Sequence, residues 1–189
     1  MSLTIGYLVG SLSAESINRR LAAALARLAP EGVELVEIAI RDLPLYNRDL
    51  DGDYPAAALD FKKAVDDVDA LLFVTPEYNR SIPAALKNAI EWGSRPWGTS
   101  SFAGVPSAVI GASVGPIATA AAQQHMRAIL GFLDSPQMGQ PEGYITFTPG
   151  LVTEHGEVTN EGTAEFLAGW MRSFEAHIQQ NRPAKVAAA

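Results

Sequence analysis

The segment ALLFVTPEYNRSIPAALKNAIEW, residues 70–92, combines a strand, a polar turn and a helix in that order. Residues 70–75 are apolar on both faces, which is typical of a parallel strand at the centre of a sheet with helices packed on either side. Pro83 favours a helix that begins there and continues to about Trp92, because proline fits the first turn of a helix. A buried strand followed by a helix is the repeating unit of a doubly wound α/β sheet.

The same alternation extends along the chain on both sides of this segment. The other predicted strands cover residues 3–10, 33–38, 105–110 and 143–147, and the other predicted helices cover residues 17–28, 55–67, 116–130 and 161–180. Residues 41–54 are rich in Asp, Pro, Gly and Asn, which predicts a surface loop. Alternating strands and helices imply right-handed crossovers, and therefore a doubly wound α/β domain with helices on both faces of a parallel sheet.

Length and composition narrow the class of protein. The chain has 189 residues, enough for one sizeable core, so we expect a single domain over residues 1–182 and a flexible tail over residues 183–189. The net charge of −7 and the lack of a basic run argue against nucleic-acid binding. The chain has no apolar stretch near the ~20 residues of a membrane span and no signal peptide, so we expect a cytoplasmic protein without membrane association. The absence of cysteine excludes disulfides, thiolate nucleophiles and Cys-based metal sites.

In a doubly wound sheet, ligands bind beyond the carboxyl ends of the strands, where the strand order reverses. Three loops should meet there: residues 10–18 (GSLSAESIN, the serine loop), residues 75–82 (TPEYNRSI, the PEYN loop) and residues 111–116 (GASVGP, the third loop). The serine hydroxyls precede a helix, where free backbone N–H groups and the helix dipole favour a phosphate. A simpler alternative is that Ser13 or Ser16 only caps that helix.

The motifs together resemble those of a known family. PEYNRSIPAALKNAIEW, with GSLSAESIN upstream and SRP at residues 94–96, resembles the NADPH-dependent FMN reductase family, which includes quinone, chromate and azo-dye reductases. The resemblance covers roughly residues 3–147. It implies a flavodoxin-like sheet of five parallel strands in the order 2-1-3-4-5, an FMN cofactor, NADPH or NADH as hydride donor, and a homodimer or homotetramer.

The resemblance also assigns the residues of the FMN site. The serine loop is assigned to the phosphate, the PEYN loop to the isoalloxazine ring, and the third loop to the ring or the ribityl chain. The assigned residues are Ser11, Ser13, Ser16, Ile17 and Asn18 in the serine loop, Pro76, Glu77, Tyr78 and Asn79 in the PEYN loop, and Ser113 and Gly115 in the third loop. Backbone N–H groups after Pro76 suit the flavin edge on which charge accumulates during reduction. For Tyr78 the alternative is packing or a subunit contact, and Ser81 is expected to cap the next helix.

The serine loop departs from the family pattern. Family members often carry Arg-Lys where this chain has Ser13-Ala14, and Glu15 follows directly. A missing bidentate cation and an added carboxylate should weaken phosphate binding by about 1–3 kcal/mol. Arg19 or Arg20, one turn further along, is the candidate for compensation.

We therefore predict an enzyme, an FMN-dependent NAD(P)H oxidoreductase that reduces quinones or similar small electron acceptors by hydride transfer through flavin N5. The flavin carries the chemistry, so no catalytic side chain is predicted. An FMN electron carrier of the flavodoxin type is an alternative. A remote alternative is a serine hydrolase, because the third loop matches the G-x-S-x-G elbow around Ser113, and Asp134 and His155 follow in hydrolase order.

Two further expectations concern residues with other conceivable roles. His125, His155 and His177 lack metal-type spacing, so we expect them on the surface or on helix faces. Trp92 is expected to pack in the core.

Overall fold

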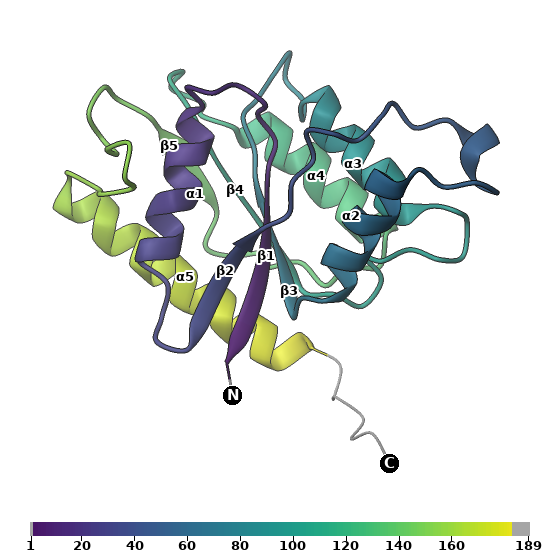
Figure 1. The fold of residues 1–189 in the computed structure, drawn as a ribbon. Coiled ribbons are helices and arrows are strands. Elements are labelled where there is room, and N and C mark those ends of the chain that lie inside the picture. Colours follow the sequence, from purple (N-terminus) through teal and green to yellow (C-terminus); the bar gives the residue numbers. More distant parts are fainter. Residues whose placement is uncertain (1, 183–189) are drawn as a thin grey trace.

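The structure, a computed structural model, describes residues 2–182, and the tail expected over residues 183–189 lies outside the described residues. Five parallel strands form one sheet in the order β2-β1-β3-β4-β5 (Figure 1), which confirms the predicted class and strand order. The strands are β1 (Leu3–Val9), β2 (Val33–Glu37), β3 (Ala70–Val74), β4 (Ser107–Ser113) and β5 (Gly143–Thr146).

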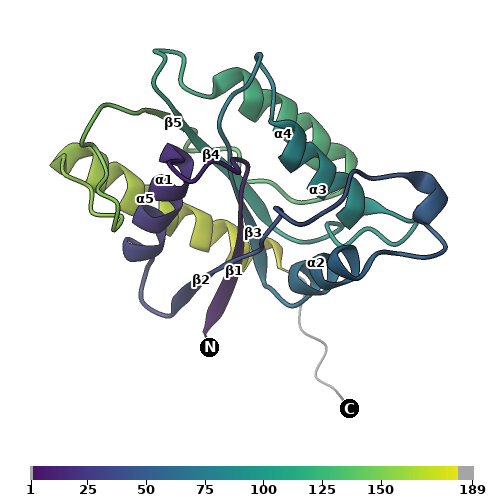
Figure 2. The same cartoon turned by 45° about the horizontal axis from the view of Figure 1, so that its top comes forward.

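Helices cover both faces of the sheet, as Figures 1 and 2 show. One face carries α1 (Ile17–Arg27) and α5 (Glu161–Asn181), and the other carries α2 (Ala56–Asp66), α3 (Ala84–Ser94) and α4 (Ala120–Phe132). Strand β3 lies between the two layers and is buried along its whole length. Leu72 and Val74 pack in the core cluster with α1 and α5, whereas Leu71 and Phe73 pack in the opposite cluster. This arrangement confirms β3 as the centre of the sheet.

Both predicted ends of β4 and the predicted start of α4 are wrong, and the errors at the two starts have a backbone cause. Strand β4 covers Ser107–Ser113 rather than residues 105–110. Pro106 has no N–H to donate, so it contributes only its carbonyl, which accepts from the amide of Leu71 at 2.9 Å. Helix α4 begins at Ala120 rather than at residue 116, because Ala118 has a left-handed φ of 52° that a helix cannot accommodate.

The predicted surface loop over residues 41–54 is anchored to α3. The indole Nε1 of Trp92 donates to the carbonyl of Pro44 at 2.7 Å, and the amide of Tyr46 donates to Asn88 Oδ1 at 2.8 Å. A short 3₁₀ turn, η1 (Arg48–Leu50), lies within this loop. Trp92 is fully buried, as expected for a core residue.

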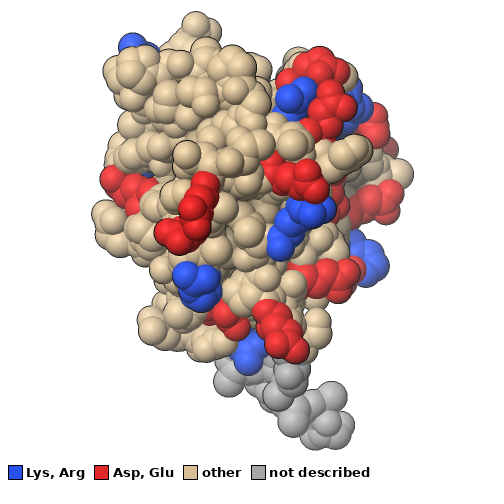
Figure 3. Space-filling model, turned by 90° about the vertical axis from the view of Figure 1, so that its left-hand side faces the viewer, with Lys and Arg blue, Asp and Glu red and all other residues tan. Residues whose placement is uncertain are grey.

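The surface carries mixed charge. On the described part of the face in Figure 3, basic and acidic side chains are interspersed and no continuous basic patch forms. Within residues 2–182, no helix combines the length and the hydropathy needed to cross a bilayer. The same part of the chain holds no cluster of His, Asp and Glu that could bind a metal ion.

Candidate functional site

The carboxyl ends of the strands bring the serine loop, the PEYN loop and the third loop together. The parallel ladder continues into the loops, since the amide of Gly10 donates to the carbonyl of Val74 at 2.9 Å. A pocket of about 250 Å³ opens between the three loops. Its lining consists of Ser11, Ser13, Glu15, Ser16, Ile17, Asn18, Pro76, Glu77, Tyr78, Ala112, Ser113 and Val114. Every residue predicted for the site lines this pocket except Asn79 and Gly115.

The serine loop presents free donors to the pocket. Ser16 caps α1, because its hydroxyl oxygen accepts from the amide of Arg19 at 3.3 Å, whereas Ser13 lies outside the cap. The amide of Ser13 donates to Ser11 Oγ at 3.4 Å, and Ala14 and Glu15 form a turn just before the helix. The remaining N–H groups surround the positive end of the α1 dipole, where an anion is stabilised. This donor set of amides and hydroxyls fits a phosphate group.

Asn18 connects the serine loop to β4. Its Nδ2 donates to the carbonyl of Ala112 at 2.9 Å, and the amide of Ala112 donates to its Oδ1 at 2.8 Å. Both residues are buried, so each bond is shielded from water. The side chain predicted to face the phosphate therefore also fixes the distance between two walls of the pocket.

The PEYN loop ends in a tight hairpin. The amides of Tyr78 and Ser81 each donate to the other residue's carbonyl at 3.0 Å. Asn79 and Arg80 between them have left-handed φ values of 53° and 63°, the pattern of a two-residue type I′ turn. Asn79 thus lies at the tip of the turn, outside the pocket lining.

Ser81 does not cap the following helix, contrary to prediction. Pro83 occupies the N-cap of α3 and no side chain provides a capping bond. The Ser81 hydroxyl instead lies 2.9 Å from Nδ1 of His125 on α4. Because proline lacks an N–H, the first turn of α3 has one donor fewer to satisfy, and the serine is free to bond elsewhere.

Glu77 fastens the PEYN loop to α4. Its Oε2 accepts from the amide of Ala122 at 3.1 Å, and its Oε1 accepts from Arg80 at 3.2 Å. Ala122 lies in the first turn of α4, and the N-cap residue Thr119 provides no side-chain bond there. A carboxylate at this end of a helix satisfies an unpaired donor and interacts favourably with the dipole. Glu77 therefore positions the loop that forms one wall of the pocket.

Tyr78 stands at the rim of the pocket with 52% of its surface exposed, which argues against the alternative that it packs within the chain. The apolar side chains of Val114 and Ile117, on and beside the third loop, are exposed to 77% and 52%. The rim is therefore apolar, whereas the floor at the serine loop is polar. The subunit contact proposed for Tyr78 stays a prediction.

The hydrolase alternative fails on geometry. Ser113 ends β4, whereas the carbonyl of Asp134 accepts from the amide of Gly104 at 2.8 Å, just before that strand begins. Strand β4 spans 7 residues, which at about 3.3 Å per residue separates Ser113 and Asp134 by roughly 20 Å. Gly111 of the motif has a packing role, because a Cβ atom added there would lie 2.0 Å from the carbonyl oxygen of Thr75.

The arginines expected to supply charge to the serine loop are paired with carboxylates. Arg19 Nη1 lies 2.8 Å from both carboxylate oxygens of Glu37 on β2. Arg20 lies 3.4 Å from Glu15, the carboxylate that lines the pocket. Neither side chain therefore presents an uncompensated cation to the pocket.

Arg41 contacts the serine loop, and no sequence pattern indicated this contact. Its guanidinium donates to the carbonyl of Leu12, within the serine loop, at 2.6 Å. Its position follows from the register of the β1–β2 pair, which no local sequence pattern specifies. Tyr7 lies opposite Glu37, so a parallel continuation of the two chains brings Arg41 beside the serine loop.

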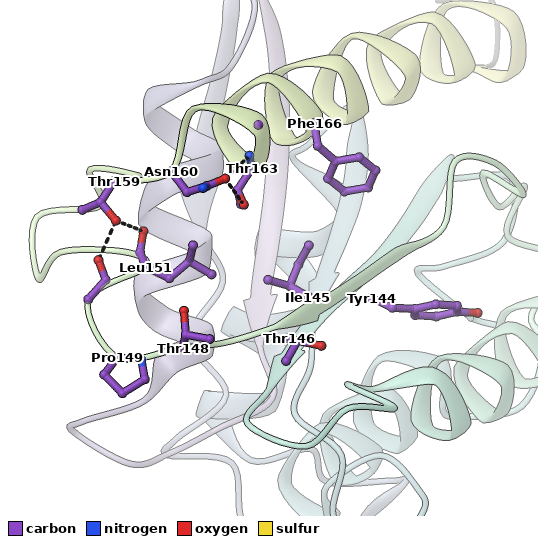
Figure 4. Close-up of a pocket in the computed structure, with 12 residues that line it drawn as sticks. Tyr144, Ile145, Thr146, Thr148, Pro149, Leu151, Thr159, Asn160, Thr163 and Phe166 are labelled. Carbon is purple, nitrogen blue, oxygen red and sulfur yellow. Dashed lines mark hydrogen bonds between the residues drawn. The ribbon is translucent and has the colours of Figure 1, made fainter.

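A second cavity, of about 630 Å³, lies between β5, the loop that follows it and the start of α5 (Figure 4). The side chains of Thr159, Asn160 and Thr163 bond to one another or to backbone. Asn160 Oδ1 accepts from the amide and the hydroxyl of Thr163, and the Thr159 hydroxyl donates to the carbonyl of Gly150 at 2.8 Å. No predicted site residue lines it. The smaller pocket between the three loops is therefore the better candidate site.

Comparisons with known proteins concern the chain as a whole. The family model for NADPH-dependent FMN reductase matches residues 3–149. A 2-hydroxy-1,4-benzoquinone reductase from a Burkholderia species is 46% identical over 182 residues, covering 96% of this chain and 100% of that protein. A quinone reductase from Pseudomonas putida is 43% identical, covering 95% of this chain and 96% of its own. The structure of FerB, a flavoenzyme NAD(P)H:(acceptor) oxidoreductase from Paracoccus denitrificans, superposes with a TM-score of 0.92 at 40% identity, covering 96% of this chain and 100% of FerB.

Proposed function

The chain belongs to the NADPH-dependent FMN reductase family, and we propose that it is an FMN-dependent NAD(P)H oxidoreductase that reduces quinones or similar small electron acceptors. The observation that carries the proposal is the pocket of about 250 Å³ between the serine loop, the PEYN loop and the third loop. It lies where a doubly wound sheet binds its ligand. The names of the similar proteins, which act on quinones, support the class of acceptor.

The polar end of the pocket suits the FMN phosphate. The hydroxyls of Ser11, Ser13 and Ser16 and the free amides of the serine loop would donate to it, at the positive end of α1. Asn18 would hold this loop against β4 through its two bonds to Ala112. The protein supplies donors that are already in place, so little order has to be gained when the phosphate binds.

The apolar end of the pocket suits the isoalloxazine ring. Pro76, Glu77 and Tyr78 would contact one side of the ring, and Ser113 and Val114 the other. Asn79 and Gly115, which were assigned to the ring by resemblance, lie just outside the lining and would be reached only by the edge of the ligand. FMN held by these residues would supply the redox chemistry, hydride acceptance from NAD(P)H and electron donation to the acceptor.

The size of the pocket explains how donor and acceptor would reach the cofactor. Pockets that enclose a whole drug-sized ligand measure about 300–1,000 Å³, so a pocket of about 250 Å³ leaves part of FMN in solvent. Tyr78 and Val114 both line the pocket and are exposed, so the open side would lie between them. A nicotinamide and then a quinone would stack there in turn.

The oligomeric state and the location are also proposals. The exposed apolar rim of Tyr78, Val114 and Ile117 would be covered by a second copy of the chain in a homodimer or homotetramer. Light scattering coupled to size-exclusion chromatography measures the mass directly, and a monomer would contradict the proposal. We propose the cytoplasm as the location because the donor, NAD(P)H, is available there; cell fractionation tests this.

The function is tested by steady-state oxidation of NADPH and of NADH with a benzoquinone as acceptor, using the purified full chain with and without added FMN. We expect quinone-dependent oxidation of at least one donor. A protein that binds FMN but oxidises neither donor would exclude the reductase and favour a flavodoxin-type electron carrier.

A further inference from the structure

We propose that Arg41 binds the phosphate of FMN and replaces the basic residues that the serine loop lacks. The inference rests on the proposed function, because it assumes that FMN is the ligand of the pocket. It adds to the site a residue from the β2 side of the sheet, outside the three loops.

The serine loop has a deficit of positive charge. Residues 10–18 contain no Lys or Arg, and Glu15 adds a carboxylate that lines the pocket. A phosphate that carries a double negative charge is bound more strongly when at least one donor is ionised. The hydroxyls and amides of the loop supply hydrogen bonds but no charge.

The two arginines at the start of α1 do not fill the deficit. Arg19 is bonded to Glu37 through two contacts of 2.8 Å, an arrangement that neutralises its charge. Arg20 lies between Glu15 and Glu154, at 3.4 Å and 3.9 Å.

Arg41 is brought to the loop by the register of the sheet. Opposite residues of β1 and β2 differ by 30 in number, as in the pair Leu3 and Val33, and the amide of Ile38 still donates to the carbonyl of Tyr7 at 2.9 Å. The same offset places Arg41 beside residue 11. Its Nη2 donates to the carbonyl of Leu12 at 2.6 Å; Arg41 and Leu12 lie outside the pocket lining, whereas Ser11 and Ser13, on either side of Leu12, belong to it.

Most of the hydrogen-bonding capacity of Arg41 remains available. A guanidinium has five N–H donors in a planar fork, and the bond to Leu12 uses one of them. Within residues 2–182, no carboxylate lies within 4.0 Å of this guanidinium. An arginine that is anchored to the loop by one N–H and carries no counter-ion suits a phosphate oxygen better than the paired arginines of α1 do.

Comparison of FMN with riboflavin isolates the contribution of the phosphate to binding, because the two compounds differ only in that group. The full chain, freed of flavin, is titrated with each compound, and the quenching of flavin fluorescence gives the two dissociation constants. For Arg41→Ala we expect the affinity for FMN to fall by about tenfold or more, the loss expected for one charge-assisted hydrogen bond. The affinity for riboflavin should change by less than about twofold, and Arg41→Lys should lie between Arg41→Ala and the wild type.

Arg172→Ala is the matched control, because it removes the same charge from an exposed position on α5. It should leave both dissociation constants unchanged. If Arg41→Ala is too unstable to titrate, Arg41→Gln keeps a planar donor, and it should still lose affinity for FMN selectively.

Three results separate the possible explanations. Equal losses of affinity for FMN and riboflavin would show that Arg41 only shapes the loop. An unchanged affinity for FMN would show that Arg41 does not contact the phosphate. Either result overturns the inference but leaves the proposed function standing. A wild-type chain that fails to bind FMN would overturn the proposed function itself.

Discussion

Replacement of Asn18 by alanine tests whether the serine loop and β4 are held together as the structure indicates. The side chain is 1% exposed, and it bonds both backbone groups of Ala112, at 2.9 Å and 2.8 Å. Alanine removes both bonds and leaves the N–H and C=O of Ala112 buried without these partners. The change leaves the apolar core clusters intact, because Asn18 belongs to neither.

The magnitude follows from the cost of an unsatisfied buried polar group, about 1–3 kcal/mol for each. Two such groups give a loss of about 2–6 kcal/mol, of which a water entering the gap would recover part. For a domain of this size, each kcal/mol lowers the melting temperature by about 2–4 °C. A loss near the middle of this range, about 4 kcal/mol, therefore corresponds to a decrease of about 8–16 °C.

The assay is urea unfolding of the flavin-free chain, followed by tryptophan fluorescence. Asn181→Ala is the matched control, because it removes an amide that bonds the carbonyl of His177 on the exposed surface; we expect it to cost less than about 0.5 kcal/mol. Asn18→Asp keeps the acceptor for the amide of Ala112 but adds a charge to the pocket, so FMN binding should weaken more than stability does. A loss for Asn18→Ala no larger than that of the control would refute the role of this bond pair.

Three further predictions concern single residues. Glu15→Gln removes a carboxylate that repels the phosphate, so it should tighten FMN binding and leave riboflavin binding unchanged. The gain should be only about two- to fivefold at low salt, because the carboxylate is 83% exposed and therefore well screened. An equal gain for both flavins would be the contrary result. Gly111→Ala should destabilise the fold by about 3 kcal/mol or more in urea unfolding, because its Cβ atom would lie 2.0 Å from the carbonyl oxygen of Thr75, and a variant of normal stability would exclude that contact. Burial, and then the charge of Asp51, raise the pKa of Tyr54 to about 12 from an ordinary value of 10.0. The folded state therefore keeps the phenolic proton more tightly than the unfolded state, and the free energy of unfolding should fall as the pH rises from about 10 to about 12. Tyr54→Phe should show a shallower decrease in urea midpoint over this pH range. The same slope in the variant and the wild type would count against the raised pKa.

The fold could be predicted from local sequence patterns, because β3 and the two helices that flank it, α2 and α3, follow one another directly along the chain. The apolar run of residues 70–75 and the proline at residue 83 marked the central strand and the start of α3 to within a residue. The errors at the starts of β4 and α4 came from single backbone positions. Pro106 cannot donate to the ladder, and Ala118 adopts a left-handed φ that its residue type does not indicate.

The position of the site could also be predicted, since the topology of a doubly wound sheet brings the three loops together. The hydrogen-bond partners of the site residues could not be predicted. Asn18 bonds Ala112, 94 residues away, and Glu77 bonds Ala122, 45 residues away. The contact of Arg41 with the serine loop depends on the register of two strands, which no local pattern specifies.

The most direct test of the central claim, that the pocket between the three loops holds FMN for reduction by a nicotinamide, is the visible absorption spectrum of the purified full chain. The spectrum is recorded without oxygen, before and after addition of NADPH or NADH. We expect a flavin band that fades when at least one donor is added and returns when a benzoquinone follows. A chain that shows no flavin band and takes up no added FMN would contradict the claim.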